Sequence, residues 1–123
     1  MKGYIRSEEE EKQIGQKTAA RFDENKNRLE LIPGYPLEEL GKVYTYGCKK
    51  YDPDNYLKGM SWRKVIGPAL RHLYKWIRGE QYDEESGIHH LSHCCWNLFT
   101  LMVYEKEKIG EDDRNPYLMD LKK

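Results

Sequence analysis

The sequence has little of what marks a secreted, membrane-spanning or nucleic-acid-coating protein. Its 123 residues include only three cysteines, two of them adjacent, so no disulfide framework is indicated. No apolar run is long enough to cross a bilayer, and the opening residues, MKGYIRSEEEEK, lack the apolar segment of a signal peptide. Basic and acidic residues balance at 21 each. We therefore expect a cytoplasmic protein that binds neither a membrane nor a nucleic-acid polymer.

Motifs of the common catalytic folds are also missing. The chain has no serine elbow, no phosphate-binding P-loop and no glycine-rich dinucleotide loop. Cys94 and Cys95 follow the apolar spacing of their segment, and we interpret both as small core residues rather than nucleophiles. If the chain performs catalysis, we expect it to use water activated by a metal ion.

What the chain does contain is helical periodicity. Apolar residues recur at three- and four-residue steps over 36–51, 62–79 and 84–108, with a kink or restart expected at Gly67-Pro68. Only residues 29–32 resemble a strand. We predict an all-α fold with three main helices in a small bundle, which a homo-oligomer would complete because three helices leave a face uncovered. The expected organisation is an acidic N-terminal arm over 1–20, an all-α core over 21–110 and a C-terminal tail over 111–123.

The last of these helices has two different faces. His90, His93 and Asn97 share one face, at spacings of three and four residues. Just upstream, Asp83 and Ser86 are N-cap candidates, and the acidic residues beside them suit the positive end of a helix. The other face is an apolar stripe, expected to face the core, made of Leu91, Cys94, Cys95, Leu98, Leu101 and Met102.

All four histidines lie between positions 72 and 93, beside a cluster of acidic residues. Neutral imidazole and carboxylate together suit a divalent transition metal, or magnesium or manganese where carboxylates predominate. The alternative is that these histidines are hydrogen-bonded structural residues. The sequence thus suggests a divalent-metal site for magnesium, manganese or zinc, with candidate ligands His72, Asp83, Glu85, His90 and His93.

Cations and aromatic residues alternate through the middle of the chain. Cationic side chains beside aromatic rings suit a nucleotide, because the cations bind phosphate and the rings stack on the base. The alternative is that the rings fill a small core and the cations are solvated. The cations concerned are Arg21, Lys26, Arg28, Lys49, Lys50, Arg71 and Lys75, and the rings are Tyr46, Tyr51, Tyr56, Trp62, Tyr74 and Trp76.

Three ordered blocks resemble a known family. RFDENKNRLELIP, YTYGCKKYDPDNYLKGMSW and RHLYKWIRGEQYDEESGIHHLSHCCWN are similar to the conserved blocks of the phage-associated dATP/dGTP diphosphohydrolase N-terminal domain family. The resemblance implies an all-α nucleotide-binding domain, active in a host cytoplasm, that cleaves deoxypurine triphosphates to monophosphate and pyrophosphate. By position, the resemblance implies these motif residues: Arg21, Asp23, Lys26, Lys49, Tyr51, Asn55, Trp62, Arg71, His72, Glu80, Asp83, Glu85, His90 and His93. We expect Asp83 and Glu85 to be catalytic. We expect substrate binding by Arg21, Asp23, Lys26, Lys49, Tyr51, Asn55, Trp62 and Arg71, together with Arg28 from the cationic set.

A more distant similarity qualifies this expectation. HHLSHCCWNLF is similar in layout to the EELGD-type helix of MazG-like nucleotide pyrophosphatases, where acidic pairs on neighbouring helices hold magnesium. Here His90 and His93 stand at the corresponding places, and the facing helix offers Arg71, His72 and Lys75. Two functional hypotheses follow: a metal-dependent nucleotide diphosphohydrolase, and a non-catalytic phage protein that sequesters a nucleotide or a cyclic immune signal. A third is a structural helical module whose polar cluster only packs.

Overall fold

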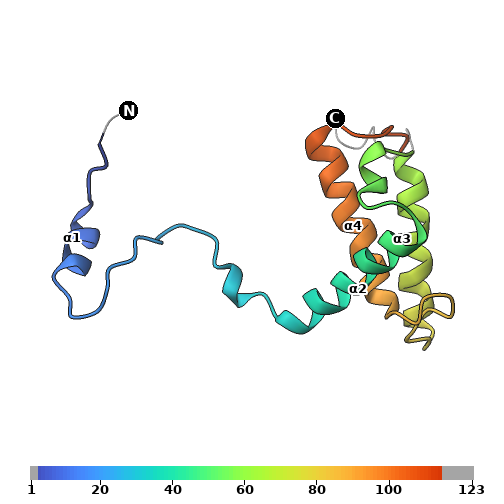
Figure 1. The fold of residues 1–123 in the computed structure, drawn as a ribbon, viewed down its shortest axis with the longest axis horizontal. Coiled ribbons are helices and arrows are strands. Elements are labelled where there is room, and N and C mark those ends of the chain that lie inside the picture. The colour runs from blue at the N-terminus through green and yellow to red at the C-terminus, as the bar shows by residue number, and fades with distance from the viewer. Residues whose placement is uncertain (1–2, 115–123) are drawn as a thin grey trace. The chain divides into compact units, whose positions relative to one another are not determined.

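The computed structural model describes residues 3–114. Internal contacts divide the chain into a first unit that ends at Ile32 and a second unit that begins at Pro33, and each is described by itself. Residues 21–32, which the sequence analysis assigns to the core, belong to the first unit by their contacts. The described residues contain four α-helices and no β-strand (Figure 1). The predicted all-α class is therefore confirmed for this part of the chain.

The first unit holds a short helix, α1 (Glu8–Ile14), and a 3₁₀ turn, η1 (Leu29–Leu31). The acidic run forms α1 because Ser7 and Glu10 make a capping box: the Ser7 hydroxyl accepts from the Glu10 amide at 3.2 Å, and the Glu10 carboxylate accepts from the Ser7 amide at 2.9 Å. Residues 29–32, the one stretch with a strand-like pattern, form no strand, since η1 occupies Leu29–Leu31.

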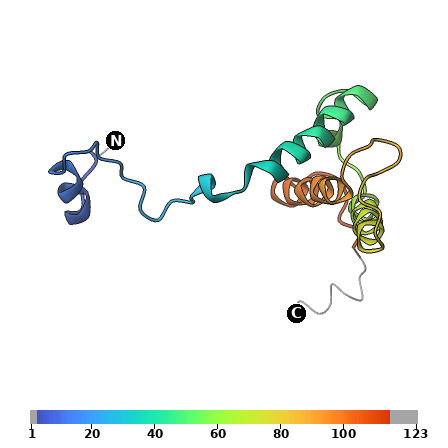
Figure 2. The same cartoon turned by 90° about the horizontal axis from the view of Figure 1, so that it is seen from below.

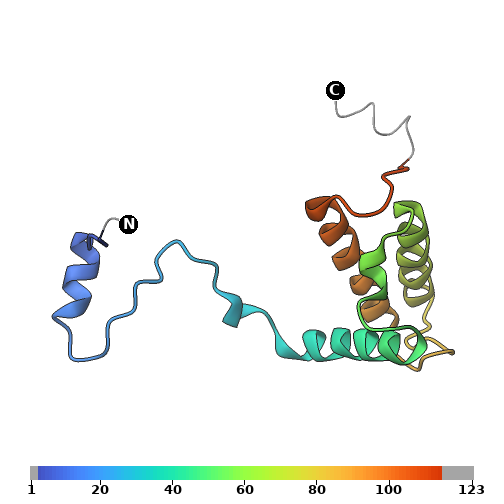
Figure 3. The ribbon, with the colours of Figure 1, turned by 45° about the horizontal axis from the view of Figure 1, so that its top comes forward.

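The second unit is built on α2 (Gly34–Lys50), α3 (Trp62–Ile77) and α4 (His90–Glu107), with the 3₁₀ turn η2 (Asn55–Lys58) between the first two. α3 and α4 run side by side in opposite directions (Figure 1), and Figure 2 shows the same two helices from below. α2 packs on α4, near the end where α4 begins (Figure 3). None of these helices combines the length and apolar character that a membrane span requires.

The two earlier predicted helices of this unit match α2 and α3, but the third begins later than predicted. α3 continues through Pro68, so the expected restart does not occur. Residues 84–89 form a loop because the Asp83 carboxylate accepts from the Ser86 amide and Gly87 has a φ of +74°. α4 then begins at His90, where the imidazole of His89 accepts from the Leu91 amide at 3.0 Å.

The inward face of α4 is polar, which corrects the expected apolar stripe. Met102 is 69% exposed, Leu98 is 49% exposed, and Cys95 is exposed although its neighbour Cys94 is buried. Most of the buried positions have polar or amphipathic side chains, because the histidine face packs against α3. Of the expected stripe, Cys94 is buried and Leu101 packs against the core. The buried residues of α4 are His90, Ser92, Cys94, Asn97, Thr100 and Tyr104. Completion of the bundle by a second copy stays a prediction.

The chain after α4 closes the unit by returning to the start of α3. Trp62 lies in the core, and its indole Nε1 donates to the Ile109 carbonyl at 2.9 Å. The Trp62 amide donates to the Glu111 carbonyl at 3.0 Å, and the Glu111 amide donates to the Met60 carbonyl at 3.3 Å. Asp113 accepts from the Arg63 amide at 3.0 Å and therefore satisfies a free N–H of the first turn of α3. The rest of the expected C-terminal tail lies outside the described residues.

Gly110 is the position where this return is tightest. Its φ of +76° is one that L side chains rarely adopt, and a Cβ there would collide with the carbonyl oxygen of Met60. Gly59, with a φ of +90°, faces Gly110 from the segment between η2 and α3, and a Cβ there would lie 3.0 Å from the Gly110 nitrogen. The close approach of these two backbone segments therefore requires glycine on both sides.

Candidate functional site

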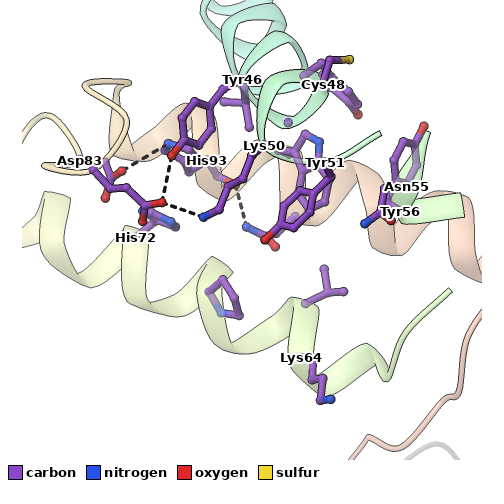
Figure 4. Close-up of a pocket in the computed structure, with 18 of the residues that line it drawn as sticks. Tyr46, Cys48, Lys50, Tyr51, Asn55, Tyr56, Lys64, His72, Asp83 and His93 are labelled. Carbon is purple, nitrogen blue, oxygen red and sulfur yellow. Dashed lines mark hydrogen bonds and ion pairs between the residues drawn. The ribbon is translucent and has the colours of Figure 1, made fainter. Parts of the chain in front are cut away.

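A cavity of about 740 Å³ lies between α2, α3, α4 and the loops that join them, within the second unit. Its charged and polar lining comes from all three helices and from the loops between them (Figure 4). Four cations line it, Lys50, Lys64, Arg71 and Lys75. Four carboxylates line it, Asp52, Asp54, Asp83 and Glu85. The volume suits a ligand of nucleotide size.

Three side chains at one end of the cavity could hold a metal ion. His72 of α3, Asp83 of the loop and His90 of α4 each offer one ligand atom, and these atoms all lie within 4.8 Å of one another. The Nδ1 atoms of the two histidines are 2.8 Å apart. His90 is fully buried behind the cavity wall, whereas His72 and Asp83 are half-buried and line the cavity.

Glu80 determines which nitrogen of His90 is free to bind. Its Oε2 lies 2.8 Å from His90 Nε2, and because a carboxylate accepts, that nitrogen carries the hydrogen. His90 Nδ1 therefore has a lone pair facing His72. In the absence of an ion, His72 Nδ1 donates to it, and a divalent cation would take the place of that proton. The donor set fits a transition metal, because it offers two imidazole nitrogens and one carboxylate oxygen.

His93 is not one of the three candidate ligands, and its imidazole binds the loop before α4. Asp83 Oδ2 accepts from the Ser86 amide at 2.9 Å and from the Ser86 hydroxyl at 2.8 Å. Because that hydroxyl donates to Asp83, it accepts from His93 Nε2, which lies 2.7 Å away. The His93 ring also stacks on His72, with centroids 4.5 Å apart. His93 thus supports both the carboxylate and the imidazole of the cluster.

Glu85 faces the opposite way, toward α2. Its Oε1 lies 2.7 Å from Lys50 Nζ and accepts from the Tyr46 hydroxyl at 2.9 Å (Figure 4). These bonds lower the pKa of Glu85, the Lys50 contact most, and raise the pKa of Lys50. Glu85 therefore ties the loop to the last turn of α2 and does not lie among the three ligand atoms.

The histidines that face the cavity are neutral at pH 7. Burial, and then the nearby rings of His93 and His90, lower the pKa of His72 to about 4. Burial also lowers the pKa of His93. Burial acts to raise the pKa of Asp83, but the hydrogen bonds from Ser86 outweigh it and hold that pKa below its usual value. His72 and Asp83 therefore present a neutral imidazole and an ionised carboxylate, the forms that bind metal.

Lowering the pH should destabilise the metal-free protein. The pKa of His72 is about 4 in the folded chain and 6.5 for the free side chain, so between these values the folded state binds fewer protons than the unfolded state. The contribution of His72 to the free energy of unfolding is therefore fully present above about pH 6.5 and is lost as the pH falls toward about 4. Urea unfolding midpoints, measured with chelator between about pH 7 and about pH 5, will show the decline. His72→Asn should make it shallower, and a midpoint that rises in acid would contradict the prediction.

The structure brings together part of the predicted site. Tyr51, Asn55, Arg71, His72, Asp83, Glu85 and His93 line the cavity, and His90 lies directly behind His72. Trp62 instead lies in the core, and Lys49 is exposed and is not part of the lining. Arg21, Asp23, Lys26 and Arg28 are exposed residues of the first unit. Their part in binding stays a prediction.

For several residues the sequence indicates presence near the site but not the role. Tyr46 and Lys50 are among the predicted rings and cations, and their spacing of four residues on α2 could have paired them. Asn97 has no role in the sequence-based prediction beyond its place on the histidine face. Glu80 does not line the cavity, and its role follows only from the structure, because its contact with His90 crosses a loop whose course the sequence does not reveal.

Comparison with known proteins shows the family to which this chain belongs. The family model for the N-terminal region of dATP/dGTP diphosphohydrolases matches residues 16–114. The chain belongs to this family. The match includes α2, α3 and α4 in full, and so every residue of the cavity and the cluster lies within the region that defines the dATP/dGTP diphosphohydrolase N-terminal family.

A curated relative carries the same name. The protein called dATP/dGTP diphosphohydrolase of Salmonella phage PMBT28 is 28% identical to this chain over 97 residues, which is 79% of this chain. The aligned region is 33% of the relative, so the chain spans about a third of that protein's length. No solved structure matches the chain.

Proposed function

We propose that this protein is a metal-dependent hydrolase of purine (deoxy)nucleoside triphosphates that releases pyrophosphate. The observation that carries the proposal is the set of three ligand atoms, from His72, Asp83 and His90, beside a cavity of nucleotide size. Membership of the dATP/dGTP diphosphohydrolase N-terminal family supports the choice of substrate. The MazG-like layout supports a site between two facing helices, although imidazoles stand here where those enzymes have carboxylates.

The donor atoms favour a first-row transition ion. Magnesium prefers an all-oxygen shell, whereas manganese and zinc also accept imidazole. His72 and His90 would bind through Nδ1 and Asp83 through its carboxylate, with Glu80 holding the His90 ring in place. A bound ion would neutralise phosphate charge and lower the pKa of a water molecule. We therefore expect manganese to support activity better than magnesium.

Cations of α3 are suited to bind the phosphates. Lys64, Arg71 and Lys75 line the cavity at helical spacing, and none of them pairs with a carboxylate within the described part of the chain. Arg71 is the neighbour of His72, so its guanidinium can contact phosphate oxygens near the ligand atoms. These groups would stabilise the charge that develops on the leaving pyrophosphate.

Glu85 is the candidate acceptor for the proton of the attacking water. It is ionised and stands two residues from Asp83, but Lys50 and Tyr46 occupy its carboxylate. A phosphate bound to Lys50 would replace that ion pair and leave the Glu85 carboxylate free to accept a proton. Binding of the substrate would therefore prepare the base.

Product analysis tests the proposal. The full chain is incubated with dATP or dGTP and manganese, magnesium or zinc, and then denatured by heat, and the nucleotides and pyrophosphate are quantified. Equal amounts of monophosphate and pyrophosphate are expected. Recovery of intact, stoichiometrically bound nucleotide would contradict hydrolysis and favour the sequestering protein. If the chain neither binds nor cleaves any purine triphosphate, only the hypothesis of a structural helical module remains.

A further inference from the structure

The end of the cavity away from the histidines has aromatic walls. Tyr44 of α2, Tyr56 of η2 and Trp96 of α4 contact one another pairwise, with ring centroids 5.8 to 6.2 Å apart. All three are half-buried and line the cavity. Figure 4 shows Tyr56 at the opposite end of the cavity from Asp83. Partly exposed aromatic faces inside a concave site provide a stacking surface for a planar base.

Asn97 adds one polar group to this part of the wall. It is only 6% exposed, lines the cavity and lies one helical turn, about 6 Å, from His93. Its amide Nδ2 donates to the main-chain carbonyl of His93 at 2.8 Å. Because a carbonyl cannot donate, this bond identifies the nitrogen end of the amide. The Oδ1 atom is therefore at the other end, where no hydrogen-bond donor meets it in the described part of the chain.

An acceptor in this position is suited to a ligand that donates. Asn97 Oδ1 is not among the fully buried atoms without a partner in residues 3–114, so it can be reached from the cavity, and a ligand N–H would take the place of solvent there. Thr100 Oγ1, one turn farther along α4, is by contrast fully buried without a partner among these residues. Thr100, however, does not line the cavity, so its hydroxyl is out of reach of a ligand bound there.

We propose that Tyr44, Tyr56, Trp96 and Asn97 form a nucleobase subsite in which Asn97 Oδ1 accepts a hydrogen bond from an N–H on the edge of the base. The inference rests on the proposed function, because phosphates held near His72 place the nucleoside toward the aromatic end. Adenine offers its exocyclic amino group there, and guanine offers its amino group and ring N–H. An unsubstituted purine offers neither and should bind more weakly.

Binding measurements with non-hydrolysable nucleotides test the subsite. The full chain with manganese is titrated calorimetrically with the α,β-methylene analogue of dATP and with the same analogue carrying unsubstituted purine. We expect the unsubstituted purine to bind at least about tenfold more weakly. In Asn97→Leu this difference should fall below about twofold, while the affinity for pyrophosphate is unchanged. Thr100→Val, the matched control on the same helix, should keep the full difference.

Each outcome decides the inference. Equal affinity of the parent chain for both analogues would overturn it, and so would a preference that survives in Asn97→Leu or a loss of pyrophosphate binding in that variant. Base discrimination without turnover of dATP would contradict the proposed hydrolysis and leave the subsite standing. Turnover of dATP by a chain that binds both analogues equally would support the proposed hydrolysis and contradict the subsite. Failure to bind any nucleotide would overturn both.

Discussion

Replacing Asp83 with asparagine will lower the turnover of dATP at least about 100-fold. Residues that only orient a metal ligand already contribute tenfold to 100-fold to affinity or activity, and Asp83 is the one carboxylate among the three ligand atoms. A neutral amide is a poor metal ligand, so the affinity for manganese should fall together with the rate. Steady-state kinetics and calorimetric titration with manganese measure the two effects separately.

Glu84 offers a matched control for this variant. It is an exposed carboxylate adjacent to Asp83 that does not line the cavity. Glu84→Gln removes the same charge from the same loop, and we expect turnover and manganese affinity within about twofold of the parent chain, since exposed charges interact weakly. Equal losses in both variants would mean that the charge of the loop matters and not the ligand atom. Parent-like activity in Asp83→Asn would contradict the assigned metal site.

The second large effect is expected at Gly110, which is far along the chain from the candidate metal ligands. Gly110→Ala should lower the free energy of unfolding by at least about 2 kcal/mol. A left-handed backbone at a residue with a Cβ accounts for about 1 to 2 kcal/mol, and the collision with the Met60 carbonyl adds to it. Chemical denaturation of the metal-free protein measures the loss.

Gly87 separates the two causes, because it has nearly the same backbone angle without the collision. Its φ is +74°, against +76° at Gly110, and a Cβ there would have no atom within 4 Å. Gly87→Ala should therefore lose only the conformational part. Gly41→Ala, within α2 and also without a neighbour, should gain about 0.5 to 1 kcal/mol. The same loss at Gly87 and Gly110 would show that the close approach to Met60 contributes nothing.

Local periodicity predicted α2 and α3 because their signals are contained in their own residues. The start of α4 was predicted too early, since the Asp83–Ser86 hydrogen bonds and the positive φ of Gly87 outweigh the helical character of the residues between them. The return of Glu111 to Met60 joins residues about fifty positions apart, and no local pattern encodes it.

The candidate site was predicted in its composition more than in its geometry. The spacing of His90 and His93 placed both on one face of α4. Only the packing of α3 decides that His90 is hydrogen-bonded to His72, whereas His93 stacks on His72 and binds Ser86. Amphipathic reasoning assigned the inward face to Leu98 and Met102, because it assumes that buried means apolar. Here hydrogen bonds between polar groups determine which face of α4 turns inward.

The polar interior of α4 also bears on how the protein persists in a cell. A helix that buries imidazole, amide and hydroxyl groups gains less from the exclusion of water than one that buries leucine. An ion held by His72, Asp83 and His90 would add its binding energy to the folded state alone. Scarcity of that ion would therefore increase the fraction of unfolded chain exposed to proteases, so that metal supply would set the lifetime of the protein as well as its proposed chemistry.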